Sequence, residues 1–346
     1  MDILLGAALV IAGLYMAWNI GANDLANAMG TSVGSKALSL KQVIILAAIF
    51  EFAGALMFGA KVTGKIAKGI VPLDLVAEIS PLIVTVGMLA AILAAAFWIT
   101  CATFYNLPVS TTHSLVGAVT GFGIVCILYG YIGVNDVEWS SLLGIAASWL
   151  VSPLIGGIVS FSVFFVIRKL LLVKSENVAG VEKKFVWAQI ATACFVAFAH
   201  GSNDVSNAIG PLYAVFHMYE YDAVGPLSLT TALLILGGGG IVIGLATWGH
   251  KVIDTVGTKI TELTPTRGFS AEFSTASVVL ANSFIGLPVS TTHTLIGSII
   301  GVGVAGGLSG VNFSVIKNIV RSWVITLPVA ALTSVIIFIP LSWIFL

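Results

Sequence analysis

Two short polar motifs each occur twice in this sequence, within stretches that are otherwise apolar. The first is GANDLANAMG at 21–30, which returns as GSNDVSNAIG at 201–210. The second is PVSTTH, found at 108–113 and again, unchanged, at 288–293. Both pairs are separated by 180 residues. Since two unrelated motifs share one offset, the sequence predicts that the chain is an internal duplication.

The Asn-Asp motif brings amide and carboxylate oxygens together. Residues three and four apart on a helix are neighbours, so Asn23, Asp24 and Asn27 can converge. Such oxygen atoms suit a hard cation such as sodium. Asparagine alone often only joins helices within a membrane, but a duplicated carboxylate beside it favours a cation site. The second copy predicts the same site from Asn203, Asp204 and Asn207.

After each Asn-Asp motif comes a segment that could interrupt the helix. Gly30-Thr31-Ser32 follows the first copy and Gly210-Pro211 follows the second. A break at these points would release backbone carbonyls as further cation ligands, so we expect the two helices to end there.

PVSTTH has the features of a helix N-terminus. Proline favours the first turn of a helix, and serine or threonine favours the cap. Unpaired N–H groups and hydroxyls at such an end can bind an anion. The alternative is a turn whose hydroxyls bond only to their own backbone. We expect His113 and His293 to be structural rather than proton carriers, and the predicted anion ligands are Ser110, Thr111, Thr112, Ser290, Thr291 and Thr292.

Neither motif contains the lysine or arginine that anion sites commonly use. A bound oxyanion together with Asp24 and Asp204 would leave several negative charges uncompensated in a medium of low dielectric constant. Mobile cations would supply the compensation. The motifs therefore predict that anion binding depends on cations. No cofactor is expected, and sodium is the predicted cation.

Three further polar residues lie in apolar segments and could contribute to coupling. Glu51 and Glu272 are carboxylates, which are functional candidates by default inside a membrane. Each could instead be neutral or paired and simply hold helices together. Gln189 lies on the segment that carries the second Asn-Asp motif and is the weaker candidate.

The composition requires that these motifs lie in a membrane. Of the 346 residues, 58% are hydrophobic and only 9% are charged, against about 25% charged in a typical soluble domain. The net charge is zero, which argues against a nucleic-acid partner. About 20 apolar residues span a bilayer. The predicted segments are 3–29, 42–60, 81–104, 108–132, 140–168, 185–215, 227–248, 270–285, 288–307 and 315–346.

The basic residues predict an orientation. The segment 168–184 carries the densest basic cluster and is expected in the cytoplasm. Counting five segments outward on each side predicts that both termini lie outside. Twelve of the fifteen lysines and arginines then lie inside, and the exceptions are Lys61, Lys65 and Lys68.

An odd number of segments per half inverts the second half relative to the first. The predicted fold is an all-α polytopic membrane protein with two inverted-topology repeats of about five spans each. Residues 1–167 and 185–346 form the repeats, joined by the linker 168–184. Inverted repeats place a shared site near the bilayer midplane, made from interrupted or re-entrant helices.

At these motifs the sequence resembles the inorganic phosphate transporter (PiT) family of cation-coupled symporters, over essentially its whole length. The resemblance implies symport of inorganic phosphate with sodium, or with protons in some bacterial members. It would place phosphate on the Ser-Thr-Thr residues and cations at the Asn-Asp motifs, and it strengthens Glu51 and Glu272 as transport residues. The long central insertion of animal members is replaced here by the short linker, which is typical of the prokaryotic form.

Several alternatives remain open at this point. Coupling to protons, carriage of metal-phosphate, or a sulfate permease of the same fold would fit similar motifs. An anion channel would need a continuous pore, and a hydrolase using Ser110 or Ser290 would lack a nucleophile elbow. We expect a multi-pass symporter of the inner cell membrane, not an enzyme. Its broad apolar surface would allow a homodimer.

Overall fold

The protein is almost entirely helical. The computed structural model describes residues 1–68, 71–307 and 311–346, although the side chains of 66–68, including Lys68, lie outside the described residues. The first half comprises α1 (Ile3–Gly34), α2 (Leu40–Lys68), α3 (Leu73–Ile79), α4 (Pro81–Phe104), α5 (Thr111–Leu128), the 3₁₀ turn η1 (Val134–Asp136) and α6 (Trp139–Ile167).

The second half follows a π-helical turn, η2 (Arg168–Leu172), and repeats the order of the longer helices. Eight helices of the described part are long and apolar enough to cross a membrane, which confirms a polytopic protein. The remaining elements are α7 (Val178–Met218), β1 (Ala223–Val224), β2 (Leu227–Ser228), α8 (Leu229–Trp248), α9 (His250–Thr258), α10 (Pro265–Phe284), α11 (Thr291–Gly306) and α12 (Phe313–Phe345).

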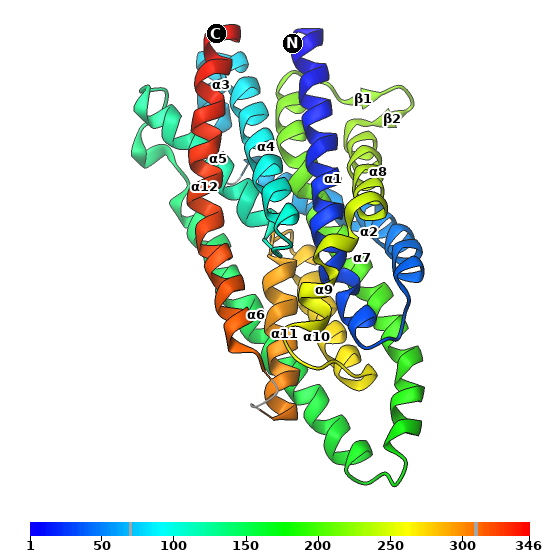
Figure 1. Ribbon diagram of the computed structural model, residues 1–346. Coiled ribbons are helices and arrows are strands. Elements are labelled where there is room, and N and C mark those ends of the chain that lie inside the picture. Colours follow the sequence, from blue (N-terminus) through cyan, green and yellow to red (C-terminus); the bar gives the residue numbers. More distant parts are fainter. Residues whose placement is uncertain (69–70, 308–310) are drawn as a thin grey trace.

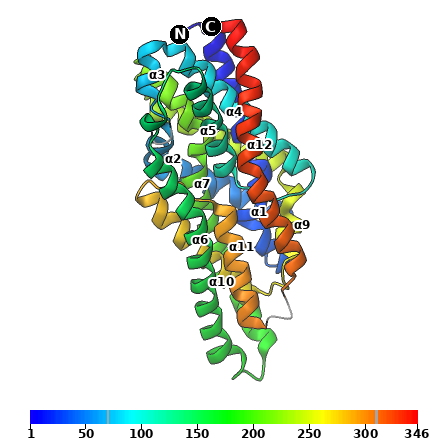
Figure 2. The same cartoon turned by 90° about the vertical axis from the view of Figure 1, so that its left-hand side faces the viewer.

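The two ends of the bundle differ in what they carry. Both termini lie at one end, and the turn between α6 and α7 lies at the other (Figure 1). The α4–α5 pair lies toward the end with the termini, whereas α10–α11 lies toward the linker, and a view turned by 90° agrees (Figure 2). Matching helix pairs of the two halves therefore lie in opposite halves of the bundle.

Each of these helix pairs is interrupted within the bundle. Asn106 and Gly286 have positive φ angles of 57° and 73°, a conformation that asparagine and glycine tolerate best. The following helices start at caps, because Ser110 Oγ accepts from His113 N and Ser290 Oγ from His293 N, both at 3.2 Å. The predicted helix starts at the two PVSTTH motifs are confirmed.

The predicted breaks after the Asn-Asp motifs are wrong. Helix α1 continues through Gly30 to Gly34, and α7 continues through Pro211 to Met218. The hydroxyls of Thr31 and Ser32 donate to another helix, so they do not compete with the backbone of α1. Proline removes only one backbone bond, and neighbouring helices support such a residue in a membrane helix.

Glycines let α1 approach α8 at backbone distance. A Cβ added at Gly21 would overlap the carbonyl oxygen of Ile241, and one added at Gly244 would overlap that of Trp18. A Cβ added at Gly240 would overlap the methyl group of Ala17. Part of the GGGG run at 237–240 thus serves close helix packing, as expected for small residues in membrane helices.

Gly244→Ala is expected to destabilise the protein by about 1–3 kcal/mol, because the new methyl group has no space against Trp18. Thermal unfolding in detergent would measure the change. Gly239→Ala is the matched control on α8, since no atom lies within 4 Å of its added Cβ, and it should leave the melting temperature unchanged or slightly raised. Equal melting temperatures for the two variants would contradict the packing argument.

Candidate functional site

Asn23 and Asn203 bind the interrupted helix pair of their own repeat. The Asn23 amide donates to Thr103 Oγ1 at 2.9 Å and to the Leu107 carbonyl at 3.1 Å, and its oxygen accepts from Val109 N at 3.2 Å. Asn203 repeats this pattern with Ser283, Leu287 and Val289 at 3.0, 3.4 and 3.2 Å. Both side chains thus fix the start of a PVSTTH helix against an Asn-Asp helix.

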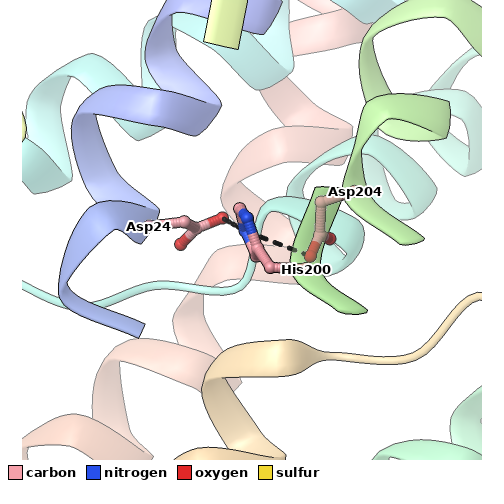
Figure 3. A group of neighbouring side chains, drawn as sticks. All are labelled: Asp24, His200 and Asp204. Carbon is pink, nitrogen blue, oxygen red and sulfur yellow. Dashed lines mark ion pairs between the residues drawn. The ribbon is translucent and has the colours of Figure 1, made fainter. Parts of the chain in front are cut away.

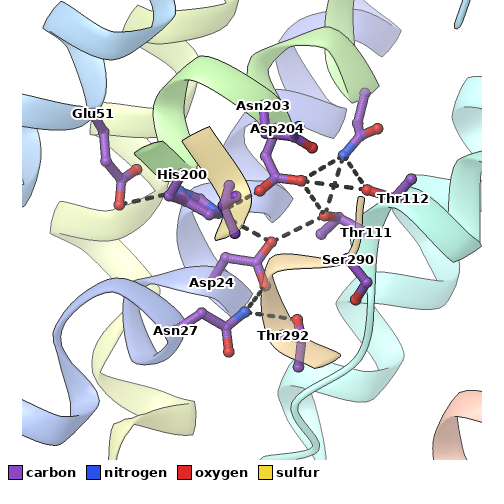
Figure 4. Close-up of polar contacts among 12 residues, drawn as sticks. Asp24, Asn27, Glu51, Thr111, Thr112, His200, Asn203, Asp204, Ser290 and Thr292 are labelled. Atoms are coloured by element: carbon purple, nitrogen blue, oxygen red, sulfur yellow. Dashed lines mark hydrogen bonds and ion pairs between the residues drawn. The ribbon is translucent and has the colours of Figure 1, made fainter. Parts of the chain in front are cut away.

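Asn27 and Asn207 reach across to the opposite repeat. Asn27 donates to Asp24 at 2.6 Å and to Thr292 Oγ1 at 2.8 Å. Correspondingly, Asn207 donates to Asp204 at 2.8 Å and to Thr112 Oγ1 at 3.1 Å. Figure 4 shows the Asn27 amide between Asp24 and Thr292. The two motifs of each repeat are thereby joined to those of the other in one polar cluster.

The threonine hydroxyls lie near carboxylates or near backbone carbonyls of the opposite repeat. Thr112 and Thr292 lie 3.2 and 3.1 Å from the carbonyls of Val289 and Val109. Thr111 Oγ1 donates to Asp24 at 3.0 Å and lies 3.4 Å from Asp204. Thr112 Oγ1 also lies 3.4 Å from Asp204. Ser110 and Ser290 use an oxygen lone pair for capping, which leaves each hydroxyl proton for another acceptor. All six predicted Ser and Thr ligands are at most 4% exposed, so they line a closed polar centre.

His200 is the residue of this cluster that the motif analysis missed. It lies on α7, one turn before Asp204, and is 1% exposed. Its Nε2 lies 3.2 Å from Asp204 and 3.5 Å from Asp24, and its Nδ1 lies 3.3 Å from Glu51 (Figures 3 and 4). Aligning the two repeats would have revealed it, because the equivalent residue of the first copy is Ile20.

The cluster has the donor set of a cation site. One ligand atom from each of Asp24, His200 and Asp204 lies within 4.8 Å of the others. Among the described residues, the Oδ1 atoms of Asn27 and Asn207 are buried without a hydrogen-bond partner, and Oδ2 of Asp204 faces only the His200 imidazole. Carboxylate and amide oxygens with free lone pairs are the ligands that hard cations prefer.

Glu51 and Glu272 lie in different places. Glu51 belongs to the central cluster through His200. Glu272 forms a separate group, where it accepts from Thr31, Ser32, Thr192 and Gln189 at 2.6, 2.7, 2.7 and 3.1 Å. This group ties α10 to α1 and α7, and Ser35 extends it by donating to Gln189 at 2.7 Å. Gln189 therefore lies beside Glu272 and not in the central cluster.

His113 and His293 lie in the middle of a cluster of four rings. The two imidazoles meet edge to face with ring centroids 4.3 Å apart. Trp149 packs against His113 at 3.7 Å in a tilted arrangement, and Trp323 stacks on His293 at 3.6 Å. Nδ1 of His293 lies 3.3 Å from the Trp149 carbonyl, which Pro153 leaves without its helical donor. This arrangement fits the structural part expected for both histidines.

A family model described as the phosphate transporter family matches residues 20–334. This range holds both copies of both motifs and every residue of the central cluster. The chain belongs to the phosphate transporter family. Its members are transporters, so the chain is a transport protein of a membrane and not an enzyme.

Similar proteins agree with this membership of the phosphate transporter family. The chain is 39% identical to the chloroplastic inorganic phosphate transporter 2-1 of Arabidopsis thaliana, over 99% of this chain and 72% of that protein. Among solved structures, one described as the sodium-dependent phosphate transporter is 38% identical. It superposes with a TM-score of 0.87 and covers 99% of this chain and 100% of its own.

Asn23→Ala is expected to lower the free energy of unfolding by about 1–3 kcal/mol, because the buried Val109 N–H loses its acceptor. Thermal unfolding in detergent measures the loss. Asn282→Ala is a suitable control, since among the described residues that amide donates only to Val278 of its own helix. If both variants melted at the same temperature, Asn23 would have no special part in positioning the helix pair.

Proposed function

We propose that this protein is a symporter that carries inorganic phosphate with sodium by alternating access. The observation that supports it best is the convergence of two Asn-Asp motifs and two Ser-Thr-Thr motifs in one buried cluster, in a chain of the phosphate transporter family. The solved relative is described as sodium-dependent, which favours sodium over protons.

Phosphate is proposed to bind between the first turns of α5 and α11. The N–H groups of a first helical turn have no partner within the helix, and they carry the positive end of the helix dipole. The hydroxyls of Ser110, Thr111 and Thr112, with those of Ser290, Thr291 and Thr292, would add donors from both repeats. Phosphate would replace the carboxylates as acceptor for some of these hydroxyls.

Sodium is proposed to bind beside the phosphate, at the two Asp and Asn pairs. Asp24 with Asn27 and Asp204 with Asn207 each offer a carboxylate and an amide oxygen that lacks a hydrogen-bond partner. For Asn23 and Asn203, which the sequence predicts as sodium ligands, we propose a positioning role instead, because both amides are already bonded to the helix pairs. A cation at each aspartate would offset the repulsion between carboxylate and phosphate, so the two ligands would bind cooperatively.

The two repeats are proposed to be inverted in the membrane, with the linker 168–184 in the cytoplasm and both termini outside. The termini share one end of the bundle, the linker lies at the other, and the α4–α5 and α10–α11 pairs lie toward opposite ends (Figure 1). The basic residues of the linker favour the cytoplasmic side. Two near-equivalent halves of this kind can exchange inward and outward conformations.

Radiolabelled phosphate uptake into liposomes tests the function directly. An inward sodium gradient is expected to drive accumulation that saturates with phosphate, whereas a proton gradient alone should give little. Uptake indifferent to sodium would overturn the sodium assignment. Unlabelled sulfate that competed as well as unlabelled phosphate would overturn the choice of substrate.

Asp24→Asn and Asp204→Asn should each abolish sodium-driven uptake, because the neutral amide removes a cation ligand and its charge. Asp74→Asn is the control, since that aspartate lies on the short surface helix α3. Size-exclusion chromatography verifies that the variants fold. Uptake at the wild-type rate in either central variant would refute its role in binding the cation.

His200→Phe is expected to lower uptake at least tenfold, because Asp24, Asp204 and Glu51 lose the imidazole between them. The phenyl ring keeps much of the side-chain volume and removes both ring nitrogens. His217→Phe, on the same helix but stacked on Tyr213, serves as the comparison. A folded His200→Phe protein with unchanged uptake would show that the imidazole only fills space.

A further inference from the structure

An apolar groove runs along the outer surface between α6 and α11. It has a volume of about 420 Å³, and its lining includes Pro153, Gly157 and Phe161 of α6 with Gly301 and Val304 of α11. Glycines form its floor: a Cβ added at Gly301 would overlap the Gly157 carbonyl. The two backbones therefore touch there, and no side chain fills the space above them.

A second, polar pocket of about 240 Å³ lies at the linker end of the same two helices. Arg168 and Arg267 line it, together with Phe164, Glu182 and Gly306. Arg168 donates to the Ala305 carbonyl at 2.8 Å, and Arg267 donates to the Glu262 carbonyl at 2.7 Å. A guanidinium group has five N–H donors, so both retain donors for an anion.

Glu182 offsets only one of these two positive charges. Its two carboxylate oxygens accept from the backbone N–H and the hydroxyl of Thr266 at 2.9 and 2.8 Å. The two arginines leave the pocket with an excess of one positive charge. Lys169 and Lys174 of the linker lie close along the chain and raise the local positive potential further.

The groove and the pocket lie next to each other along both helices. On α6, Phe161 lines the groove and Phe164 lines the pocket, less than one turn later. On α11, Val304 and Gly306 are related in the same way. From Pro153 to Phe161 the groove extends about 12 Å along α6, close to the ~15 Å of one leaflet of hydrocarbon.

We infer that this combined surface binds one anionic phospholipid, with an acyl chain in the α6–α11 groove and the phosphate headgroup at Arg168 and Arg267. A hydrocarbon slot that opens into a pair of arginines is complementary to an amphiphile with an anionic head. Basic pockets between membrane helices on the cytoplasmic side recognise such headgroups. The site lies on α11, the helix whose first turn carries Thr291 and Thr292.

Lipid fits this surface better than a second copy of the chain. A self-contact through the groove would bring the arginines of both copies toward one another or leave them unpaired. The neighbouring π-helical turn exposes Leu170 and Leu171 beside Arg168, which is the mixture of apolar and basic side chains that a membrane interface favours.

Native mass spectrometry tests the proposal on the full chain released from mixed phosphatidylglycerol and phosphatidylcholine vesicles. The wild-type protein should retain one phosphatidylglycerol in preference to phosphatidylcholine. The double variant Arg168→Gln/Arg267→Gln should bind phosphatidylglycerol roughly 30-fold more weakly, since two basic contacts are lost. The matched control Lys169→Gln/Lys174→Gln removes the same charge from the linker without altering the pocket, and it should keep the lipid.

A second variant keeps the test decisive if the arginine variant does not fold. Val304→Phe fills the part of the groove nearest the arginine pocket and leaves every charge in place. Because the acyl chain loses its space, this variant should also lose the retained phosphatidylglycerol. Equal retention in all variants, or equal loss in the arginine and lysine pairs, would overturn the site. A wild-type dimer that Val304→Phe converts to monomer, with no bound lipid, would assign the groove to a second copy instead.

Discussion

Asp24 and Asp204 are both fully buried, and among their described partners there is no lysine or arginine. Burying a carboxylate costs several kcal/mol unless donors replace the lost water. Here the donors are neutral amides and hydroxyls, together with the imidazole of His200. These donors come from α1, α7 and the first turn of α5, and Thr292 of α11 in turn accepts from the Asn27 amide. The cluster therefore keeps its hydrogen bonds only while all four helices stay in register.

That register depends on residues that are not expected to touch a transported ion. Asn23 and Asn203 hold the interrupted helix pairs by three hydrogen bonds each. Glycines bring α1 against α8 at backbone distance. Inside a membrane, backbone groups at a helix interruption have no water to bond with. Here the asparagine side chains supply hydrogen bonds to these groups, and close helix packing shields them. Asparagine thus has two structural roles within one motif. Asn23 holds the helix pair of its own repeat, and Asn27 joins Asp24 to the other repeat.

The features that sequence predicted are those with local signals. The duplication follows from two motifs with one offset, and the helix starts at Ser110 and Ser290 follow from capping and proline preferences. A positive φ angle at Asn106 or Gly286 is likewise a property of the residue itself. Helical segments were found from runs of apolar residues, because their length is set by the bilayer.

The predictions that failed or fell short depend on contacts between distant residues. Thr31 and Ser32 resemble a helix end in isolation, yet their hydroxyls bond to Glu272, 240 or more residues away. Nothing near Asn27 in the sequence indicates that its amide reaches Thr292 of the other repeat. Identical residues in the two copies do not point to His200, because the equivalent residue of the first copy is Ile20. His200 is distinctive because it differs between the copies.

Such differences between the two halves bear directly on the proposed alternating access. Two identical inverted halves would give inward and outward states of equal free energy, so any bias must come from residues that break the symmetry. Glu272 is one of these, since its equivalent in the first half is Ile92, and Gln189 corresponds to Leu9. The four donors to Glu272 join α10 to α1 and α7 toward the linker end. The equivalent positions of the other half are apolar.

Opening the linker end would break hydrogen bonds to a buried carboxylate, and opening the other end would separate only apolar side chains at these positions. Under the proposed mechanism, this inequality favours conformations closed toward the linker, and ligands that bind the central cluster would have to offset it before release on that side.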